Sequence, residues 1–260
     1  MPRLSLPLFI FFLSALLAGV QPQSAAGQSL GTPPAAPAIV LGFVGGYVKH
    51  DNAVHAEVQL AARLRAEYPA GVHIDVFENH CGKQALREVL QLLDTKHEGS
   101  LSESEKQYAR IILYGHSWGA SEAIQLARSL GAEGIPVLLT VQVDSVAKRG
   151  ENDSIIPPNV AQAANLYQTF GLIRSRRLIR AADPSRTRII GNFRFDYRDH
   201  PIDCPHYPWW DRYLARPHTE IECDPSVWNQ VESYIRSSLL PITPHPAAPG
   251  AEERTGLKGP

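Results

Sequence analysis

The stretch 110–121, which reads RIILYGHSWGAS, constrains the fold of this chain more than any other. It begins with an apolar run at 111–114 whose β-branched and aromatic residues are typical of a buried central strand. The run stops at a Gly-x-Ser-x-Gly turn formed by Gly115, Ser117 and Gly119, and helix-forming residues follow. The two glycines allow a sharp turn because no side chain can strike the neighbouring strand or helix. The pattern therefore predicts a strand, a strained turn at Ser117 and a helix.

Strands and helices alternate on both sides of this stretch. The hydrophobic patterns predict buried strands at 38–41, 72–77, 137–143 and 188–195, and amphipathic helices at 54–68, 83–93 and 225–239. Residues 145–187 are less regular, and we expect a short helix at 160–167 within a possible small lid. Such alternation predicts an α/β fold, with a mainly parallel central sheet and helices on both faces.

The two ends of the chain differ from its centre. Residues 1–26 combine an early arginine, an apolar run and small residues, which is the pattern of a signal peptide. A membrane anchor is the alternative, but the apolar run is short for a bilayer span. We expect a linker at 27–37, the folded domain at 38–240 and a disordered tail at 241–260. The mature protein is therefore predicted to be secreted or periplasmic, without a stable membrane anchor.

Charge and cysteine content limit the partners and the bonds of the chain. The formal net charge of −1 over 260 residues gives no reason to expect nucleic acid as a partner. Export would place three cysteines in an oxidising compartment, and at least one of them must stay unpaired within a monomer. A bridge between Cys204 and Cys223 is one expectation. Three reduced cysteines, Cys81 included, are the alternative, because spacing alone does not determine connectivity.

Residues 94–105 have part of the spacing of an EF-hand calcium loop. An acid stands at the first position, Gly99 at the sixth and Glu105 at the twelfth. Lys96, however, stands at the third ligand position and would place a cation beside the metal. We therefore favour a connection between two helices, with a turn at Gly99 and Ser102 as the N-cap. No metal and no organic cofactor is expected.

With this strand, turn and helix at its centre, the chain resembles the α/β-hydrolase superfamily, and most closely its lipase and esterase branch. The resemblance covers about 38–240 and is strongest at the loop of Gly42, at Ser117 and at the strand that ends in Asp144. It implies an α/β-hydrolase fold with a nucleophile elbow, in an exported serine hydrolase that cleaves small-molecule or lipid esters. A thioesterase or amidase, or a non-catalytic binding protein with the same fold, are the alternatives.

A catalytic serine needs a base that removes its proton. The chain order of the superfamily, serine, acid and then histidine, excludes the histidines before Ser117. His218 is favoured because it stands in a predicted loop directly before the last helix, where this fold presents its base. His206 and His200 are the alternatives, and His116 is expected to pack or hydrogen-bond locally.

The base in turn needs an acid that holds its tautomer. Asp144 ends a buried strand, and 144 − 117 = 27 residues are enough for one strand–helix–strand step beyond Ser117. Asp196, at the end of a later strand, occupies the commoner position in the superfamily and is the alternative. Its polar neighbours indicate a surface segment, so Asp144 is favoured.

The resemblance also implies an oxyanion hole and a substrate site. The donors would be the backbone amides of Trp118, at the start of a helix, and of Phe43, after the first strand, with Val44 as the alternative to Phe43. Leu41 stands where related loops carry a histidine, but a backbone donor does not depend on that side chain. Trp209 and Trp210 are the candidate substrate-binding residues for an apolar acyl or aryl group.

Overall fold

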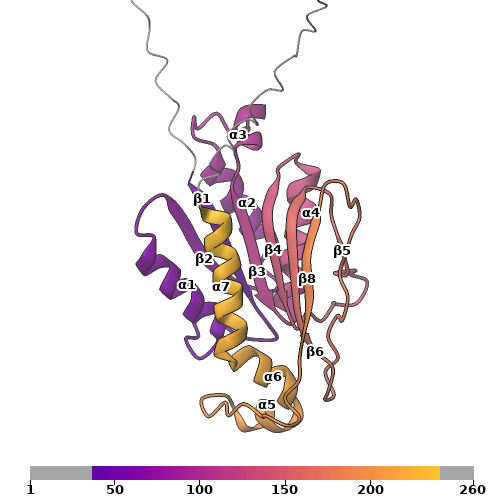
Figure 1. The fold of residues 1–260 in the computed structure, drawn as a ribbon. Helices are drawn as coiled ribbons and strands as arrows, with labels where there is room; N and C mark the ends of the chain where they lie inside the picture. Colours follow the sequence, from indigo (N-terminus) through magenta and orange to yellow (C-terminus); the bar gives the residue numbers. More distant parts are fainter. Residues whose placement is uncertain (1–36, 241–260) are drawn as a thin grey trace, which may run out of the picture. The chain divides into compact units, whose positions relative to one another are not determined.

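The computed structural model describes residues 37–240 (Figure 1). The predicted signal peptide, nearly all of the predicted linker and the predicted tail lie outside the described residues. Within 37–240, no helix combines the length and the apolarity that crossing a membrane requires.

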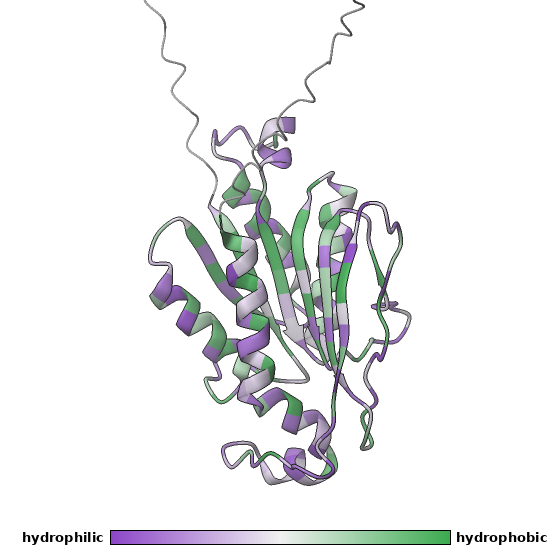
Figure 2. Cartoon of the chain, viewed as in Figure 1, coloured by the Kyte–Doolittle hydropathy of each residue, from purple (hydrophilic) through white to green (hydrophobic). Residues whose placement is uncertain are grey.

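Six parallel strands form the central sheet in the order β2-β1-β3-β4-β6-β8. They are β1 (Ala38–Val44), β2 (Val72–Glu78), β3 (Ile111–His116), β4 (Val137–Val143), β6 (Val160–Gln168) and β8 (Arg188–Phe195). A second, two-stranded sheet pairs β5 (Ile155–Ile156) with β7 (Arg180–Ala181). Figure 2 shows apolar residues along the central strands, as expected for parallel strands that are covered on both faces.

Helices cover both faces of this sheet and enclose two apolar cores. On one face α1 (Ala56–Glu67) and α7 (Pro225–Leu239) pack against side chains such as Val40 and Ile112. On the other face α2 (Gly82–Leu93) and α4 (Trp118–Ala132) pack against Ile39 and Ile111. Successive residues of a strand point to opposite faces, which is why neighbours in sequence serve different cores. The predicted α/β class is confirmed.

Three short helices complete the described part of the chain. They are α3 (Glu103–Gln107), α5 (Trp209–Leu214) and α6 (Arg216–Cys223). Figure 1 shows α5 and α6 beyond the carboxyl ends of the central strands, whereas α3 lies near their amino ends. The carboxyl edge is where parallel α/β sheets place their ligands and catalytic groups.

The predicted helix at 160–167 is wrong, because this segment is the inner strand β6. It pairs with β4 on one side and with β8 on the other. Ala163, Ala164 and Leu166 are fully buried. Alanine and glutamine favour a helix in isolation, but pairing on both edges outweighs that preference. Since 145–187 contains a strand of the central sheet, the segment as a whole is not a lid.

The segment 94–105 forms the predicted connection between two helices. Ser102 caps α3, and its backbone N–H donates in return to the side chain of Glu105. Glu105 also accepts hydrogen bonds from Thr95, and Asp94 accepts one from the amide of Gly99. These carboxylates are therefore already used to hold the turn.

The predicted bridge between Cys204 and Cys223 is confirmed, with 6.0 Å between the two Cα atoms. It ties the segment before α5 to the last residue of α6. Cys81, at the start of α2, is a free cysteine.

Candidate active site

Ser117 lies in the turn between β3 and α4 with strained backbone angles. Its φ of 56° and ψ of −125° are unusual for a residue that carries a Cβ atom. The Ser117 N–H donates to the carbonyl of Val143, at 3.0 Å, so the neighbouring strand holds the turn in place. A Cβ atom on Gly115 would lie 2.6 Å from the backbone of Gly119, and one on Gly119 would strike the carbonyl of Phe43. The two glycines are needed because strand and helix pass so close together.

The structure brings Asp144 and His218 into direct contact. Asp144 Oδ2 lies 2.6 Å from His218 Nδ1, and the aspartate side chain is fully buried. Gln168, at the end of β6, donates its backbone N–H to Asp144 Oδ1 and its side-chain amide to Asp144 Oδ2, each at 2.9 Å. These bonds orient the carboxylate toward the imidazole, as in a pair that fixes the tautomer of a histidine.

His218 was predicted in a loop, but it lies in α6 and is 8 % exposed. Pro217 stands in the first turn of this helix, where its missing N–H has no intrahelical partner to lose. Thr219 and Ile221, two residues of this helix, are buried. Burial of these residues keeps α6 in place, although the aromatic and proline-rich sequence before it resembles an irregular loop.

Among the described residues, no hydrogen bond joins Ser117 Oγ to His218. The ring of His218 lies instead against the ring of His116, with 4.4 Å between the two centroids. Nδ1 of His218 is occupied by Asp144, so Nε2 is the nitrogen left for a serine proton. Catalytic hydrogen bonds are often long before substrate binds, and the arrangement is compatible with a serine and its base.

The alternative acid and bases lie on the surface. Asp196 is exposed and is ion-paired with Arg194 and Arg198. The hydrogen bond from Arg198 lowers the pKa of Asp196 to about 2. His200 and His206 are both exposed, and the structure gives neither of them a carboxylate partner among the described residues.

The backbone around the elbow differs in one respect from the predicted oxyanion hole. β1 continues through Val44, so Phe43 lies inside the sheet and is paired with both β2 and β3. The residue in contact with Ser117 is Gly45, since a Cβ atom added there would lie 2.9 Å from Ser117 Cβ. Trp118 is the first residue of α4, and the first N–H groups of a helix have no intrahelical partner.

Trp209 and Trp210 lie on α5, and their side chains are 61 % and 51 % exposed. Tyr213 and Leu214 of the same short helix are also exposed, and none of its residues is buried. The helix is attached to α6 next to the candidate base, because Thr219 donates its hydroxyl to a backbone carbonyl of α5. An aromatic, exposed helix thus borders the helix that carries the histidine.

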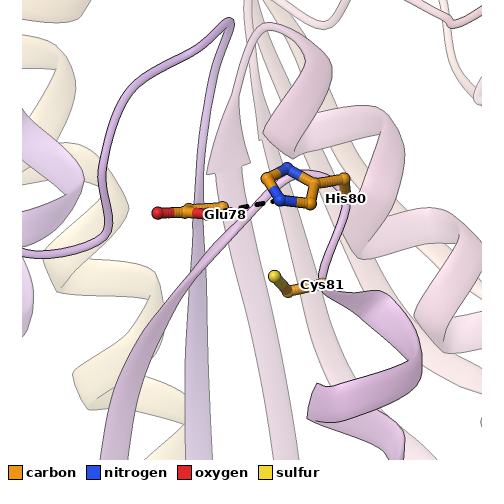
Figure 3. A group of neighbouring side chains, drawn as sticks. All are labelled: Glu78, His80 and Cys81. Carbon is orange, nitrogen blue, oxygen red and sulfur yellow. Dashed lines mark ion pairs between the residues drawn. The ribbon is translucent and has the colours of Figure 1, made fainter.

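Figure 3 shows Glu78, His80 and Cys81, which converge at the carboxyl end of β2. One possible ligand atom of each lies within 4.8 Å of the others. Glu78 is, however, ion-paired with Lys49 at 3.3 Å, as well as with His80 at 3.3 Å. A lysine on the carboxylate competes with a metal ion for it, so ion pairing accounts for this group.

The order of six parallel strands, with a strained serine after the third strand in sequence and a buried aspartate–histidine pair beside it, defines the α/β-hydrolase fold. The predicted resemblance is confirmed at the level of the fold. No protein-family model and no curated protein matches the chain.

Solved structures similar to this chain include three enzymes or enzyme-like proteins. A cutinase-like protein from Cryptococcus sp. is 12% identical, with 80% of this chain and 97% of that chain covered and a TM-score of 0.41. A thermostable esterase from Pseudomonas putida is 12% identical, with coverages of 76% and 72% and a TM-score of 0.40. A type II thioesterase from the yersiniabactin pathway is 12% identical, with coverages of 77% and 94% and a TM-score of 0.40. Similarity this low carries no argument about the reaction, which must come from the site itself.

Proposed function

We propose that this protein is an exported serine hydrolase that cleaves carboxylic esters through Ser117, His218 and Asp144. The observation that carries the proposal is the 2.6 Å contact between Asp144 Oδ2 and His218 Nδ1. The carboxylate that makes it is fully buried and follows β4, the strand next to β3, which Ser117 follows. The expectation of export rests on residues 1–26 of the sequence.

Ser117, His218 and Asp144 would each have a defined part in the reaction. His218 takes the proton of Ser117 through Nε2 while the serine oxygen attacks the ester carbonyl. Asp144 holds the Nδ1–H tautomer and stabilises the imidazolium that forms. The imidazolium then gives its proton to the leaving alcohol, and an acyl group remains on Ser117. Water, activated by the same histidine, releases the acid and restores the serine.

Two backbone amides would stabilise the tetrahedral oxyanion. The Trp118 amide, at the start of α4, is one donor, because it lies at the positive end of the helix dipole. Since Phe43 is held inside the sheet and Gly45 is the residue against Ser117, we infer that the second donor comes from residues 44–46, at the end of β1 and in the turn after it. This placement replaces the Phe43 amide that the sequence suggested.

The exposed aromatic residues of α5 favour a substrate with an apolar acyl or aryl group. Trp209 and Trp210 contact each other edge to face, with 5.8 Å between the ring centroids, and offer a large apolar surface next to α6. A thioester substrate is the second candidate, since the same residues could attack a thioester carbonyl. A small-molecule or lipid ester is the partner we expect.

The proposal is tested by labelling the purified chain with a serine-reactive fluorophosphonate and mapping the labelled peptide. We expect the label on Ser117, and Ser117→Ala should lose both labelling and ester hydrolysis, by about 10⁴-fold or more in turnover. A series of p-nitrophenyl esters of increasing acyl length, compared with acyl thioesters, identifies the substrate class. An unlabelled, inactive wild-type protein would favour a binding protein, and an active Ser117→Ala variant would exclude the mechanism.

A further inference from the structure

A second group of buried acids and histidines lies behind the elbow. Glu57 on α1 and Glu222 on α6 are 0 % and 6 % exposed. One side-chain nitrogen or oxygen of His55, Glu57 and Glu222 lies within 4.8 Å of the other two. The reaction proposed above uses none of these side chains, so their burial needs a separate explanation.

The carboxyl group of Glu57 lacks a partner as long as it is ionised. Neither of its oxygens has a hydrogen-bond partner among the described residues. A carboxylate can only accept hydrogen bonds, so Glu57 and Glu222 cannot bond to each other while both are charged. Two buried negative charges side by side are also strongly unfavourable. A proton on one of the acids removes both difficulties, because the protonated acid can donate to the other.

A metal ion between the two acids is the competing explanation, and one distance argues against it. His55 Nδ1 and Glu222 Oε1 lie 2.5 Å apart, which is a hydrogen-bond distance. Two ligand atoms at about 2.0–2.2 Å from a tetrahedral metal ion lie about 3.3–3.6 Å from each other. The histidine and the glutamate are therefore bonded to each other and are too close to be ligands of one ion.

Glu222 connects this group to the candidate base. It stands four residues after His218 on α6, so both side chains leave the helix on the same face. Glu222 Oε2 lies 3.4 Å from Nδ1 of His116, the residue directly before Ser117. The ring of His116 packs in turn against the ring of His218. One carboxylate thus lies in contact with the ring against which the histidine of the proposed triad packs.

We propose that Glu57 and Glu222 share one proton, donated by the carboxyl group of Glu57 to the carboxylate of Glu222, and that Glu222 is a positioning residue for His218. The second half of this proposal rests on the proposed function, whereas the shared proton does not. The proton stays within the pair during the reaction. The role of Glu222 is to limit the position of His116 through this contact, and through His116 the position of the His218 ring.

The ionisation of the surrounding groups agrees with this arrangement. Burial raises the pKa of Glu222 to about 7, and burial followed by the charge of Glu222 raises the pKa of Glu57 well above its ordinary range. Burial, and then the charge of His218, lower the pKa of His116 well below its ordinary value. A neutral His116 can lie against His218 without repelling the imidazolium that the reaction would form.

The shared proton is tested by infrared spectroscopy of the protein without substrate. A protonated, buried carboxyl group has a carbonyl stretch that an ionised carboxylate lacks. We expect this band in the wild type above about pH 7, where Glu222 is mostly ionised, and its loss in Glu57→Gln. Glu232→Gln is the matched control: Glu232 is also buried, but it is ion-paired with Arg63 and Arg236, so its substitution should leave the band unchanged.

The positioning role is tested by kinetics on the same variants. Glu222→Gln should slow fluorophosphonate labelling and ester turnover by about 10- to 100-fold with little change in KM, because the ring of His218 is displaced while the substrate site is intact. Glu57→Gln should retain much more activity than Glu57→Met, since the amide can still donate a hydrogen bond to Glu222 and the thioether cannot. Thermal melting confirms that each variant is folded, and the Glu57 comparison remains decisive if Glu222→Gln is not.

The shared proton, the positioning role and the proposed hydrolase would each be contradicted by a different result. A stoichiometric metal ion in the purified wild type that is lost from Glu57→Gln, or the absence of the carboxyl band, would overturn the shared proton. Wild-type labelling rates in a folded Glu222→Gln variant would overturn the positioning role and leave the proposed hydrolase intact. A wild type that no fluorophosphonate labels would instead exclude the hydrolase, and the infrared band would still decide where the proton lies.

Discussion

Two residues of the proposed triad have backbone angles that side chains rarely tolerate. Ser117 has a φ of 56° and Asp144 a φ of 44°. Such conformations cost about 1–3 kcal/mol each and persist only where the surrounding structure enforces them. Here the sheet enforces them, because the Ser117 N–H bonds to β4 at 3.0 Å and the Asp144 N–H bonds to Leu166 of β6 at 2.7 Å. Both strained residues follow adjacent strands, and the strain turns their side chains toward one edge of the sheet.

Replacing Asp144 by Asn changes one side-chain oxygen to nitrogen and so tests the acid of the proposed triad. Asp144→Asn should lower turnover by about 10³- to 10⁴-fold, because the amide favours the wrong tautomer of His218. Asp196→Asn should change turnover by less than about twofold, since this exposed side chain is paired only with arginines. The measurement is kcat on one p-nitrophenyl ester for both variants, with melting curves as the check on folding. If the two variants rank in the opposite order, the acid belongs at the end of β8.

At the scale of elements, the turn after β1 determines how closely β1 and the elbow can approach. A Cβ atom on Gly45 would lie 2.9 Å from Ser117 Cβ and 3.1 Å from the carbonyl of His116, and neither neighbour is the end of a flexible chain. Gly46, the next residue, has open space around it but a φ of 48°. A substitution at Gly45 therefore tests the effect of a close contact, whereas a substitution at Gly46 tests the effect of backbone strain.

Gly45→Ala should lower turnover by about 10- to 100-fold, because the elbow and the adjacent amides must move apart. Gly46→Ala should cost about 1 kcal/mol of stability through its positive φ and change turnover much less. Unfolding in urea and kcat on the same ester separate the two effects. Equal activity of both variants and the wild type would mean that this turn does not shape the oxyanion hole.

The Cys204–Cys223 bridge encloses α5 and most of α6, which carries His218. Closing a loop with a sequence separation of 19 stabilises the fold by about 3 kcal/mol in the chain-entropy model. The sheet and the elbow lie outside this loop, so reduction should displace the histidine before it unfolds the chain. We expect mild reduction to slow ester hydrolysis at temperatures where the far-UV spectrum is unchanged. Alkylation of the free Cys81 alone is the control, and equal activity of the oxidised and reduced protein would contradict this role.

At the scale of the whole molecule, most of the sheet could be predicted because its strands are apolar runs between turns. The predictions at 72–77, 137–143 and 188–195 lie within or coincide with β2, β4 and β8. β6 could not be predicted, since its alanines, asparagine and glutamines carry no strand signal. Its identity as a strand comes from pairing on both edges, and local preference does not contain that information.

Some residues of the candidate site could be predicted from the sequence, and others could not. Ser117, Asp144 and His218 could be named from a local turn, a strand end and the chain order of the superfamily. Gln168 could not be found, because the strand that carries it was not recognised. Glu222 gave no signal either, since one partner, His55, is 167 residues away at the N-cap of α1, and the other, His116, stands directly before Ser117. Contacts between elements of distant sequence become visible only once the sheet has brought the elements together.

The buried acids also affect the stability of the whole molecule, and the sign of the effect can be worked out. A carboxyl group whose pKa is raised in the folded state binds more protons there than in the unfolded chain. Its contribution to stability is full below the unfolded pKa and is lost as the pH rises through the folded pKa. For Glu222 this window runs from its ordinary value of 4.5 to about 7. The titratable groups that face the acid pair are His55, His116, Tyr207, Asp211 and His218.

Burial also raises the pKa of Glu57 well above its ordinary value, and Glu57→Gln removes the part of the effect that belongs to Glu57, because an amide cannot ionise. Burial also lowers the pKa values of His55 and His116, and these two groups lose stability in the opposite direction, as the pH falls. Both histidines are present in the wild type and in the variant, so their contribution largely cancels in the difference between the two. The melting temperature of Glu57→Gln minus that of the wild type should therefore increase steadily between about pH 4.5 and pH 7, by an amount that Glu232→Gln does not show. A difference that is constant over this range would mean that Glu57 loses its proton at the same pH in the folded and the unfolded chain, and that the folded pair holds no shared proton at neutral pH.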